Sequence, residues 1–205
     1  MPQFIQILES RLLLSSVTLA IAEAQLSADF TKLIADAKTA KPVLIDSAKT
    51  FTVEVKLLDL KTSPLKATLT NDISTARTVL SGDVGKIINA GKTDALAIVS
   101  DVLHITLLNL GKPTKIAATQ VKLANNIAAL EKVETPLIDK LSSDVTTQSN
   151  KIGAAISAIV TANPGDQALS MDWTNLSGVF QTEEQILVPD MDNVITDLGA
   201  LSMAS

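Results

Sequence analysis

Apolar residues recur every three or four positions along most of this chain, the spacing that gathers them on one face of an α-helix. The run Thr-Phe-Thr-Val-Glu-Val at 50–55 would also suit a strand, but strand partners are lacking elsewhere in the sequence. We therefore predict an all-α fold, an antiparallel bundle of five or six helices with a C-terminal tail. The expected helices cover residues 27–41, 43–58, 62–80, 93–111, 116–130 and 135–162.

Proline and glycine mark the expected helix ends. Pro42 is expected to end or bend the first helix at Lys41. A glycine-rich loop is expected over 81–91, and Thr93 or Asp94 then begins the most apolar helix, which should be buried because its apolar residues cover more than one face. The remaining boundaries are expected at Thr62-Ser63-Pro64, Gly111-Lys112-Pro113, Thr135-Pro136 and Asn163-Pro164-Gly165-Asp166.

The first 24 residues resemble a signal peptide. An apolar stretch there ends in Ala22-Glu23-Ala24, a small-x-small cleavage pattern, and is too short to span a bilayer. We expect cleavage after Ala24, and the alternative is an amphipathic first helix. The predicted organisation is a signal peptide over 1–24, a helical bundle domain over 25–163 and a partly helical tail over 164–205.

Composition narrows the class of protein. Hydrophobic residues make up 46% of the 205 residues but aromatic residues only 2%, so the core is expected to be aliphatic, and such cores can leave dry apolar voids. The net charge is −5 and the 17 basic residues are scattered, which argues against nucleic acid as a partner. Disulfides and thiolate metal sites are excluded because there is no cysteine. Beyond Ala24 no apolar run is long enough for a membrane helix, so we do not expect an integral membrane protein.

Residues that could carry chemistry do not converge on a recognisable site. The segment 86–93 ends like a phosphate-binding loop, but Lys86 stands where that motif needs glycine. His104 is the only histidine, it lies on the most apolar predicted helix, and no Gly-x-Ser-x-Gly sequence surrounds a serine. Neither feature predicts a catalytic site.

Acidic pairs near the C-terminus are also poor site candidates. Asp190-Met191-Asp192 lacks the glycine and the later glutamate of a calcium loop, so we expect acidic residues in a first helical turn. Adjacent carboxylates such as Glu183 and Glu184 would point apart on a helix. We expect no enzyme, no cofactor and no metal.

The central segment resembles the fungal hydrophobic surface-binding protein A family. The resemblance is carried by residues 93–99, by the stretch 107–113 with its Lys-Pro element, and by the helical spacing of 123–130 and 137–160. It covers roughly residues 27–162. The chain departs from the family where it continues through Pro42 without a Phe-x-Gly-Gly-like break, and its tail from Gly165 has no family counterpart. The resemblance implies secretion, residence in the fungal cell wall as in related galactomannoproteins, an apolar tunnel for fatty acids and adsorption to hydrophobic surfaces.

Two functions follow as hypotheses. The first is a secreted binding protein, extracellular or in the cell wall, that holds fatty acids or other lipids inside its helical bundle. The alternative is a surface-active or structural cell-wall protein that adsorbs to hydrophobic surfaces. Asn175, in Asn175-Leu176-Ser177, is a glycosylation candidate. The candidate cavity residues are Ile98, Val102, Ile105, Leu123, Ile127, Leu141, Ile152 and Ile156.

Overall fold

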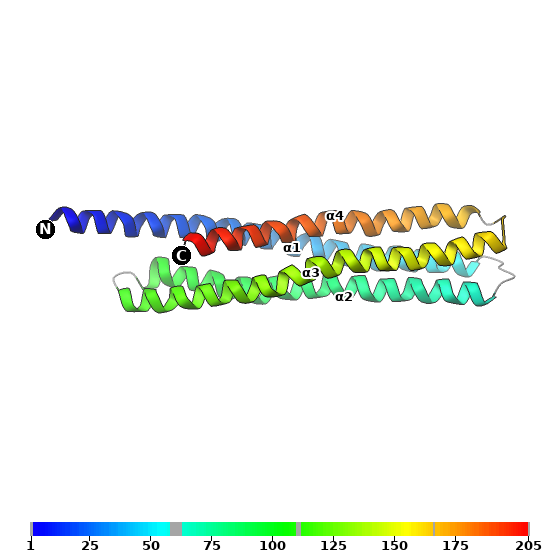
Figure 1. The fold of residues 1–205 in the computed structure, drawn as a ribbon, viewed down its shortest axis with the longest axis horizontal. Coiled ribbons are helices and arrows are strands. Elements are labelled where there is room, and N and C mark those ends of the chain that lie inside the picture. The colour runs from blue at the N-terminus through cyan, green and yellow to red at the C-terminus, as the bar shows by residue number, and fades with distance from the viewer. Residues whose placement is uncertain (1, 58–62, 110–111, 166, 205) are drawn as a thin grey trace. The chain divides into compact units, whose positions relative to one another are not determined.

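The computed structural model describes residues 2–57, 63–109, 112–165 and 167–204, and within these ranges it is helical with no strand (Figure 1). Helix α1 spans Pro2–Leu57 and α2 spans Ser63–Leu103. A π-helical segment, η1, continues α2 over His104–Leu108. Helix α3 spans Pro113–Ala162 and α4 spans Gln167–Ala204. The all-α prediction is thus confirmed, but the described residues form four α-helices rather than five or six.

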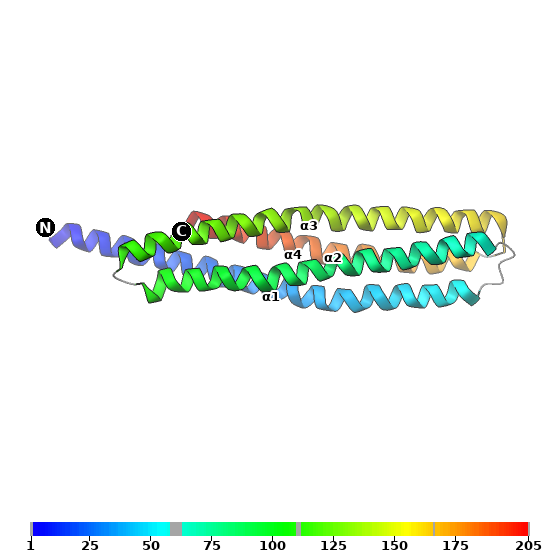
Figure 2. The same ribbon diagram turned by 90° about the horizontal axis from the view of Figure 1, so that it is seen from below.

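The chain divides into two compact units. Unit 1 comprises Met1–Ile34, Asn89–Pro136 and Asp190–Ser205, and unit 2 comprises Ala35–Ile88 and Leu137–Pro189. Each of the four helices contributes one segment to each unit. Within unit 2, Figures 1 and 2 show consecutive helical segments running in opposite directions.

Buried residues follow a spacing of three and four along every helix, which keeps one stripe of each helix facing its neighbours. On α1, for example, the stripe in unit 2 runs from Ala37 through Ala40, Leu44 and Ala48 to Phe51. The core of unit 1 is built from Leu19, Leu26, Phe30, Leu33, Ile98, Val102, Ile105, Leu123, Ile127, Leu130, Met191, Val194, Leu198 and Leu201. All these side chains are at most 8% exposed.

Three prolines lie inside helices. Of the two outcomes expected at Pro42, an end or a bend, the end is therefore excluded, and the helix boundary predicted at Thr135-Pro136 is wrong. Pro42, Pro136 and Pro189 are all exposed. The carbonyl four residues before each proline, at 38, 132 and 185, also belongs to an exposed residue, so water can replace the missing hydrogen bond. The apolar stripe continues on both sides of each proline, and its burial holds the helix together.

The predicted glycine-rich loop over 81–91 is also wrong, because α2 runs through it without a break. Gly91 has a packing role: a Cβ there would lie 3.1 Å from Ile34 Cγ1, so the missing side chain lets α2 approach α1 closely within unit 1. Gly82 has open space around it and no such role. Thr93 and Asp94 consequently lie within α2 and do not begin a helix.

The helix expected to be fully buried has one exposed side. Ile98 and Val102 are buried, but Leu96 is 71% exposed and Leu107 is 61% exposed. Apolar composition over more than one face therefore did not mean burial here. The boundary near Lys112-Pro113 and the turn at Asn163-Pro164-Gly165 are confirmed, whereas Gly111 and Asp166 lie outside the described residues.

The two ends of the chain are helical. Helix α1 begins at Pro2 and continues past Ala24, the predicted cleavage position, and Leu19 is buried in the core of unit 1. The segment after Gly165 forms α4, whose Leu176 and Leu198 are buried, so this segment supplies core residues to both units. No helix in the described part of the chain carries an apolar stretch long enough to cross a membrane.

Candidate functional site

The eight candidate cavity residues are all buried, but they do not form one site. Five of them lie in unit 1 and three in unit 2. The unit 1 residues are Ile98, Val102, Ile105, Leu123 and Ile127, and the unit 2 residues are Leu141, Ile152 and Ile156. Their side chains are between 0% and 8% exposed, as expected for residues that build two cores. Only Val102 also lines a groove open to solvent.

That groove is an apolar concave surface of unit 1. It has a volume of about 380 Å³ and lies between one wall from α1 and another from α2 and η1. Six of its eight lining residues are aliphatic, and Val17, Leu103 and Leu107 are 56%, 43% and 61% exposed. The lining residues are Val17, Ala20, Glu23, Val99, Val102, Leu103, Thr106 and Leu107.

Two polar residues complete the groove. The hydroxyl of Thr106 donates a hydrogen bond to the carbonyl of Val102 over 2.9 Å, so this proton is not available to a ligand in the groove. Glu23 is half-buried and forms no hydrogen bond or ion pair within the described part of the chain. No lysine, arginine or histidine is among the eight lining residues. The groove therefore offers an apolar wall and one unpaired carboxylate.

The π-helical turn shapes one end of this wall. It spans His104–Leu108 and closes with the Asn109 amide donating to the carbonyl of His104 over 3.0 Å. Thr106 and Leu107 belong to this turn and line the groove. Single π-helical turns inside α-helices occur frequently at functional sites, because the extra residue re-aims the side chains that follow.

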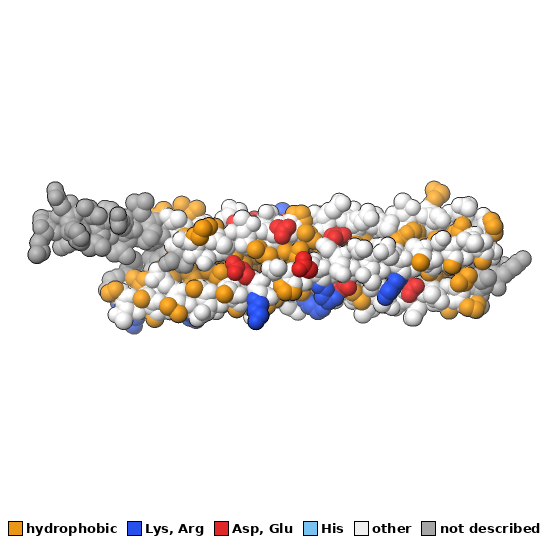
Figure 3. Space-filling view, in the orientation of Figure 1, with side chains coloured by type: hydrophobic (Ala, Val, Ile, Leu, Met, Phe, Trp, Pro, Cys, Tyr) orange, Lys and Arg blue, Asp and Glu red, His pale blue; other side chains and the backbone are white. Residues whose placement is uncertain are grey.

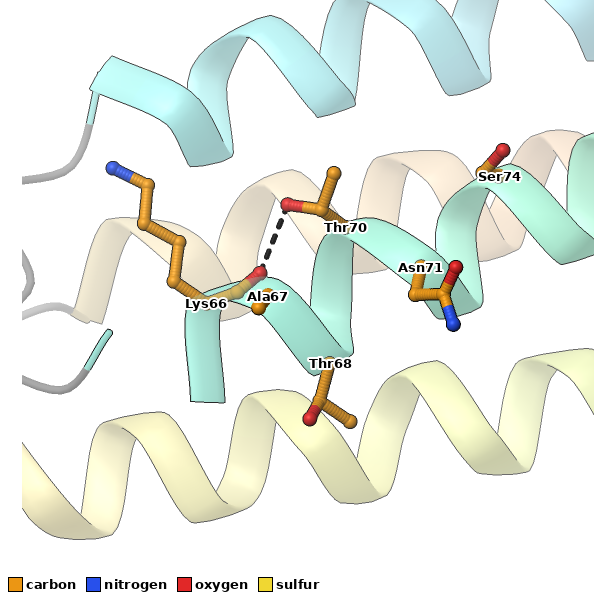
Figure 4. A pocket seen from close by; sticks show the side chains of 6 residues that line it. All are labelled: Lys66, Ala67, Thr68, Thr70, Asn71 and Ser74. Carbon is orange, nitrogen blue, oxygen red and sulfur yellow. Dashed lines mark hydrogen bonds between the residues drawn. The ribbon is translucent and has the colours of Figure 1, made fainter. Parts of the chain in front are cut away.

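Unit 2 carries concave surfaces of a different character. One, of about 330 Å³, lies between α1 and α4 and includes Asp46, Glu54 and Asp172 beside Phe51. Another, of about 780 Å³, is a shallow hollow on α2 lined by Lys66, Ala67, Thr68, Thr70, Asn71 and Ser74. Figure 4 shows the side chains of this hollow leaving one helix in different directions, with the hydroxyl of Thr70 bound to the carbonyl of Lys66. They do not converge as catalytic groups would.

Buried acidic side chains in both units are held by lysines. In unit 1, Asp101 accepts hydrogen bonds from Lys122 and from Asn126, each over 2.6 Å, and Lys32 pairs with buried Asp190. In unit 2, Lys86 and Lys140 approach Asp83 at 3.0 and 3.5 Å, and Lys140 also pairs with Asp144. Lys122 and Lys140 link α3 with the buried aspartates of α2, and Lys32 links α1 with α4, whereas the other two pairs lie within one helix. All of them are explained as structural contacts.

Charge and burial shift the pKa of several carboxyls. Burial, a hydrogen bond with Asp29 and the charge of Asp29 together raise the pKa of Asp197 in unit 1 to about 6. In unit 2, burial and the charge of Asp36 raise the pKa of Glu183. Burial acts to raise the pKa of Asp144, but hydrogen bonds to Lys140 and Asp83 and the charges of Lys140 and Lys86 together outweigh it, so the net pKa is lowered.

Candidate catalytic residues do not come together. His104 is exposed, and its Nδ1 lies 2.7 Å from the backbone carbonyl of Ser100. The segment 86–93 lies within α2, where Lys86 pairs with Asp83, so it forms no phosphate-binding loop. Among the described residues, no group of three histidine or acidic side chains could hold a metal ion.

The acidic pairs and the glycosylation candidate all lie on α4. Asp190 and Asp192 are in the middle of this helix, so the expectation that they belong to a first helical turn is wrong. Glu183 and Glu184 are both half-buried on the same helix. Asn175 is exposed and borders the acidic groove of unit 2.

The α1 wall of the groove was missed because Val17, Ala20 and Glu23 fall in the predicted signal peptide. A signal in the sequence could have found it. The apolar stripe of α1 extends backward from Phe30 to Leu26 and then, one heptad earlier, to Leu19. That regularity predicts that the packed helix extends back to Leu19.

Searches against protein-family models, curated proteins and solved structures find no match to this chain. The resemblance to the fungal hydrophobic surface-binding protein A family therefore stays a prediction.

Proposed function

We propose that the four helices form an antiparallel bundle and that this non-enzymatic protein binds fatty acids or similar apolar molecules. The groove of unit 1 supports this proposal, because its lining is mostly aliphatic and open to solvent. Its volume of about 380 Å³ lies within the range of roughly 300–1,000 Å³ that is usual for small-molecule sites. A ligand in this groove would cover side chains that are now exposed to water, including Leu103 and Leu107.

The groove bears on the prediction of a cleaved signal peptide. Cleavage after Ala24 would remove Val17, Ala20 and Glu23, and it would also remove Leu19 from the core of unit 1. The burial of Leu19 supports the alternative that this segment stays in the protein as the first part of α1. Determining the N-terminal residue of the protein recovered from its native source distinguishes cleavage after Ala24 from retention of this segment. A chain beginning at Gln25 would be the cleaved form and would lack the α1 wall of the groove.

The ligand proposal is tested on the full-length chain by native mass spectrometry before and after extraction with organic solvent. We expect a bound lipid at one or two molecules per chain, which extraction removes and added hexadecanoic acid restores. Ala20→Phe places a ring in the groove and should abolish rebinding. Ala28→Phe is the matched control, because Ala28 is exposed on the same helix and does not line the groove. A chain that never accepts lipid would refute the proposal.

The alternative is a surface-active protein, and the exposed aliphatic side chains support it. Of the 14 large hydrophobic residues exposed in the described chain, nine lie in unit 1. They are Val17, Ile21, Leu96, Leu103, Leu107, Leu108, Val121, Val133 and Met203. Where such side chains adjoin on a surface, they promote adsorption to apolar interfaces.

Pendant-drop tensiometry distinguishes this alternative from ligand binding. Leu96→Gln removes an exposed side chain that does not line the groove, so it should weaken surface activity and leave lipid binding unchanged. Ala20→Phe should weaken lipid binding and leave surface activity unchanged. If both variants weaken both properties equally, the groove and the apolar surface act as one feature and the surface-active function is favoured.

A further inference from the structure

Among the described residues that line the apolar groove of unit 1, Glu23 is the one titratable residue. Val17, Ala20 and Glu23 follow one another at intervals of three along one face of α1, so the carboxylate lies at one end of the α1 wall. The rest of that wall is aliphatic. An elongated apolar ligand in the groove would therefore meet a charge at one end only.

The charge of Glu23 is not neutralised by the protein. No hydrogen bond or ion pair reaches its carboxylate within the described ranges, whereas Asp101 and Asp190 in the same unit are each held by a lysine. The part of the groove lining that the structure describes contains no cationic side chain that could receive an anionic head group. A fatty-acid carboxylate beside Glu23 would meet like charge, and like charges at short range disfavour binding.

We propose that Glu23 makes this groove selective for single-chain amphiphiles with a cationic head group, that is, long-chain amines, over carboxylates of the same chain length. The inference rests on the proposed function, the binding of single-chain apolar molecules in this groove, but makes amines the preferred ligands in place of fatty acids. An ammonium group donates hydrogen bonds and pairs with a carboxylate, and such charge-assisted hydrogen bonds are the strong ones. A long-chain alcohol can donate one hydrogen bond without a charge, so its affinity falls between the two. The net charge of −5 favours the same order at longer range.

The experiment is isothermal titration of the full-length protein at pH 7 with dodecylamine, dodecanol and dodecanoate, each below its critical micelle concentration. At this pH the amine is protonated and the dodecanoate is ionised, as lysine and glutamate side chains are. We expect dodecylamine to bind about tenfold or more tightly than dodecanoate, the ratio that about 1.4 kcal/mol produces. Glu23→Gln keeps the shape of the side chain and should bring the two affinities together.

Asp192→Asn is the control for net charge, because Asp192 is exposed on α4 in unit 1 and does not line the groove. It should leave the ratio between amine and dodecanoate unchanged. Equal binding of the three probes to the unmodified protein would overturn the inference and leave the proposed function intact. An amine preference that survives Glu23→Gln, or that Asp192→Asn reduces as much, would also overturn the inference. If none of the three binds, the proposed function itself fails.

Discussion

Unit 1 and unit 2 are built from segments of the same four helices, yet they distribute their apolar side chains differently. Three of the five aromatic residues in the sequence, Phe51, Trp173 and Phe180, form a cluster in unit 2 with ring centroids 6.5 Å apart. The described core of unit 1 has Phe30 among aliphatic residues and Met191. Among the side chains that the structure describes, unit 1 leaves nine large hydrophobic residues exposed, against five in unit 2.

The comparison shows that similar helical stripes can produce two kinds of surface. In unit 2 the concave surfaces are polar or acidic, while in unit 1 the groove is apolar with one carboxylate. On the face drawn in Figure 3, basic side chains do not gather into one patch. The proposed function therefore rests on the outward-facing residues of unit 1.

The largest expected effect concerns the aromatic cluster of unit 2. Phe180→Ala removes a buried ring, 1% exposed, and should lower the free energy of unfolding by about 3–5 kcal/mol. Urea titration followed by the fluorescence of Trp173 measures the change within the affected unit, because Trp173 contacts Phe180 there. Met171→Ala, at a 71% exposed position on the same helix, should stay within about 0.5 kcal/mol of the original protein. Equal losses in the two variants would contradict the packing described for this cluster.

The next effect concerns a buried charge in unit 1. Lys122→Met leaves the buried carboxylate of Asp101 with Asn126 as its remaining partner, and should cost about 1–3 kcal/mol of unfolding free energy. Chemical denaturation followed by circular dichroism measures it. Lys115→Met changes an exposed lysine on the same helix and should have little effect. If the two variants are equally stable, the ion pair between Lys122 and Asp101 contributes nothing to the free energy of unfolding.

Helix contact in unit 1 can be tested at two glycines. Gly91→Ala places a Cβ 3.1 Å from Ile34 Cγ1 and 3.4 Å from the ring of Phe30. Overpacking of about 1–3 kcal/mol is then set against the roughly 0.5–1 kcal/mol that alanine gains over glycine within a helix. Gly199→Ala meets nothing within 4 Å and should stabilise helix α4 by about 0.5–1 kcal/mol. The unfolding temperature of Gly199→Ala should therefore be higher than that of the original protein, and that of Gly91→Ala should be lower. The reverse ranking would mean that α2 and α1 do not approach closely at Gly91.

The smallest effect is a difference in pH dependence. The pKa of Asp197 is raised from 3.8 to about 6, so its contribution to stability is fully present below about 3.8 and is lost as the pH rises through about 6. In unit 2 the lowered pKa of Asp144 acts in the opposite direction, because its contribution is present above 3.8 and is lost in acid.

Calorimetric unfolding at pH 4.5 and 7.5 measures the Asp197 contribution. Asp197→Asn imitates the protonated carboxyl at both pH values, so its unfolding temperature should fall less between them than that of the original protein. Asp192→Asn, which changes an exposed acid on the same helix, should keep the original pH dependence. An unchanged pH dependence in Asp197→Asn would show that Asp29 and Asp197 do not interact.

Much of the local structure follows from the sequence. The three-and-four spacing of apolar residues determined that the described chain is helical and that positions such as Ile98 and Ile152 are buried, because a helix must bury its apolar stripe. The turn at Asn163-Pro164-Gly165 also follows from local chemistry, since proline and glycine there both disfavour a continued helix.

Tertiary structure decided what local signals could not. Pro42, Pro136 and the glycines of α2 did not end helices, because packing along a continuous apolar stripe outweighs the local cost of a lost hydrogen bond or of a flexible residue. Likewise, only packing brings Val17, Ala20 and Glu23 beside residues about eighty positions later in the chain to form the groove. Sequence spacing reports which face of one helix is apolar, whereas a groove depends on which two faces meet.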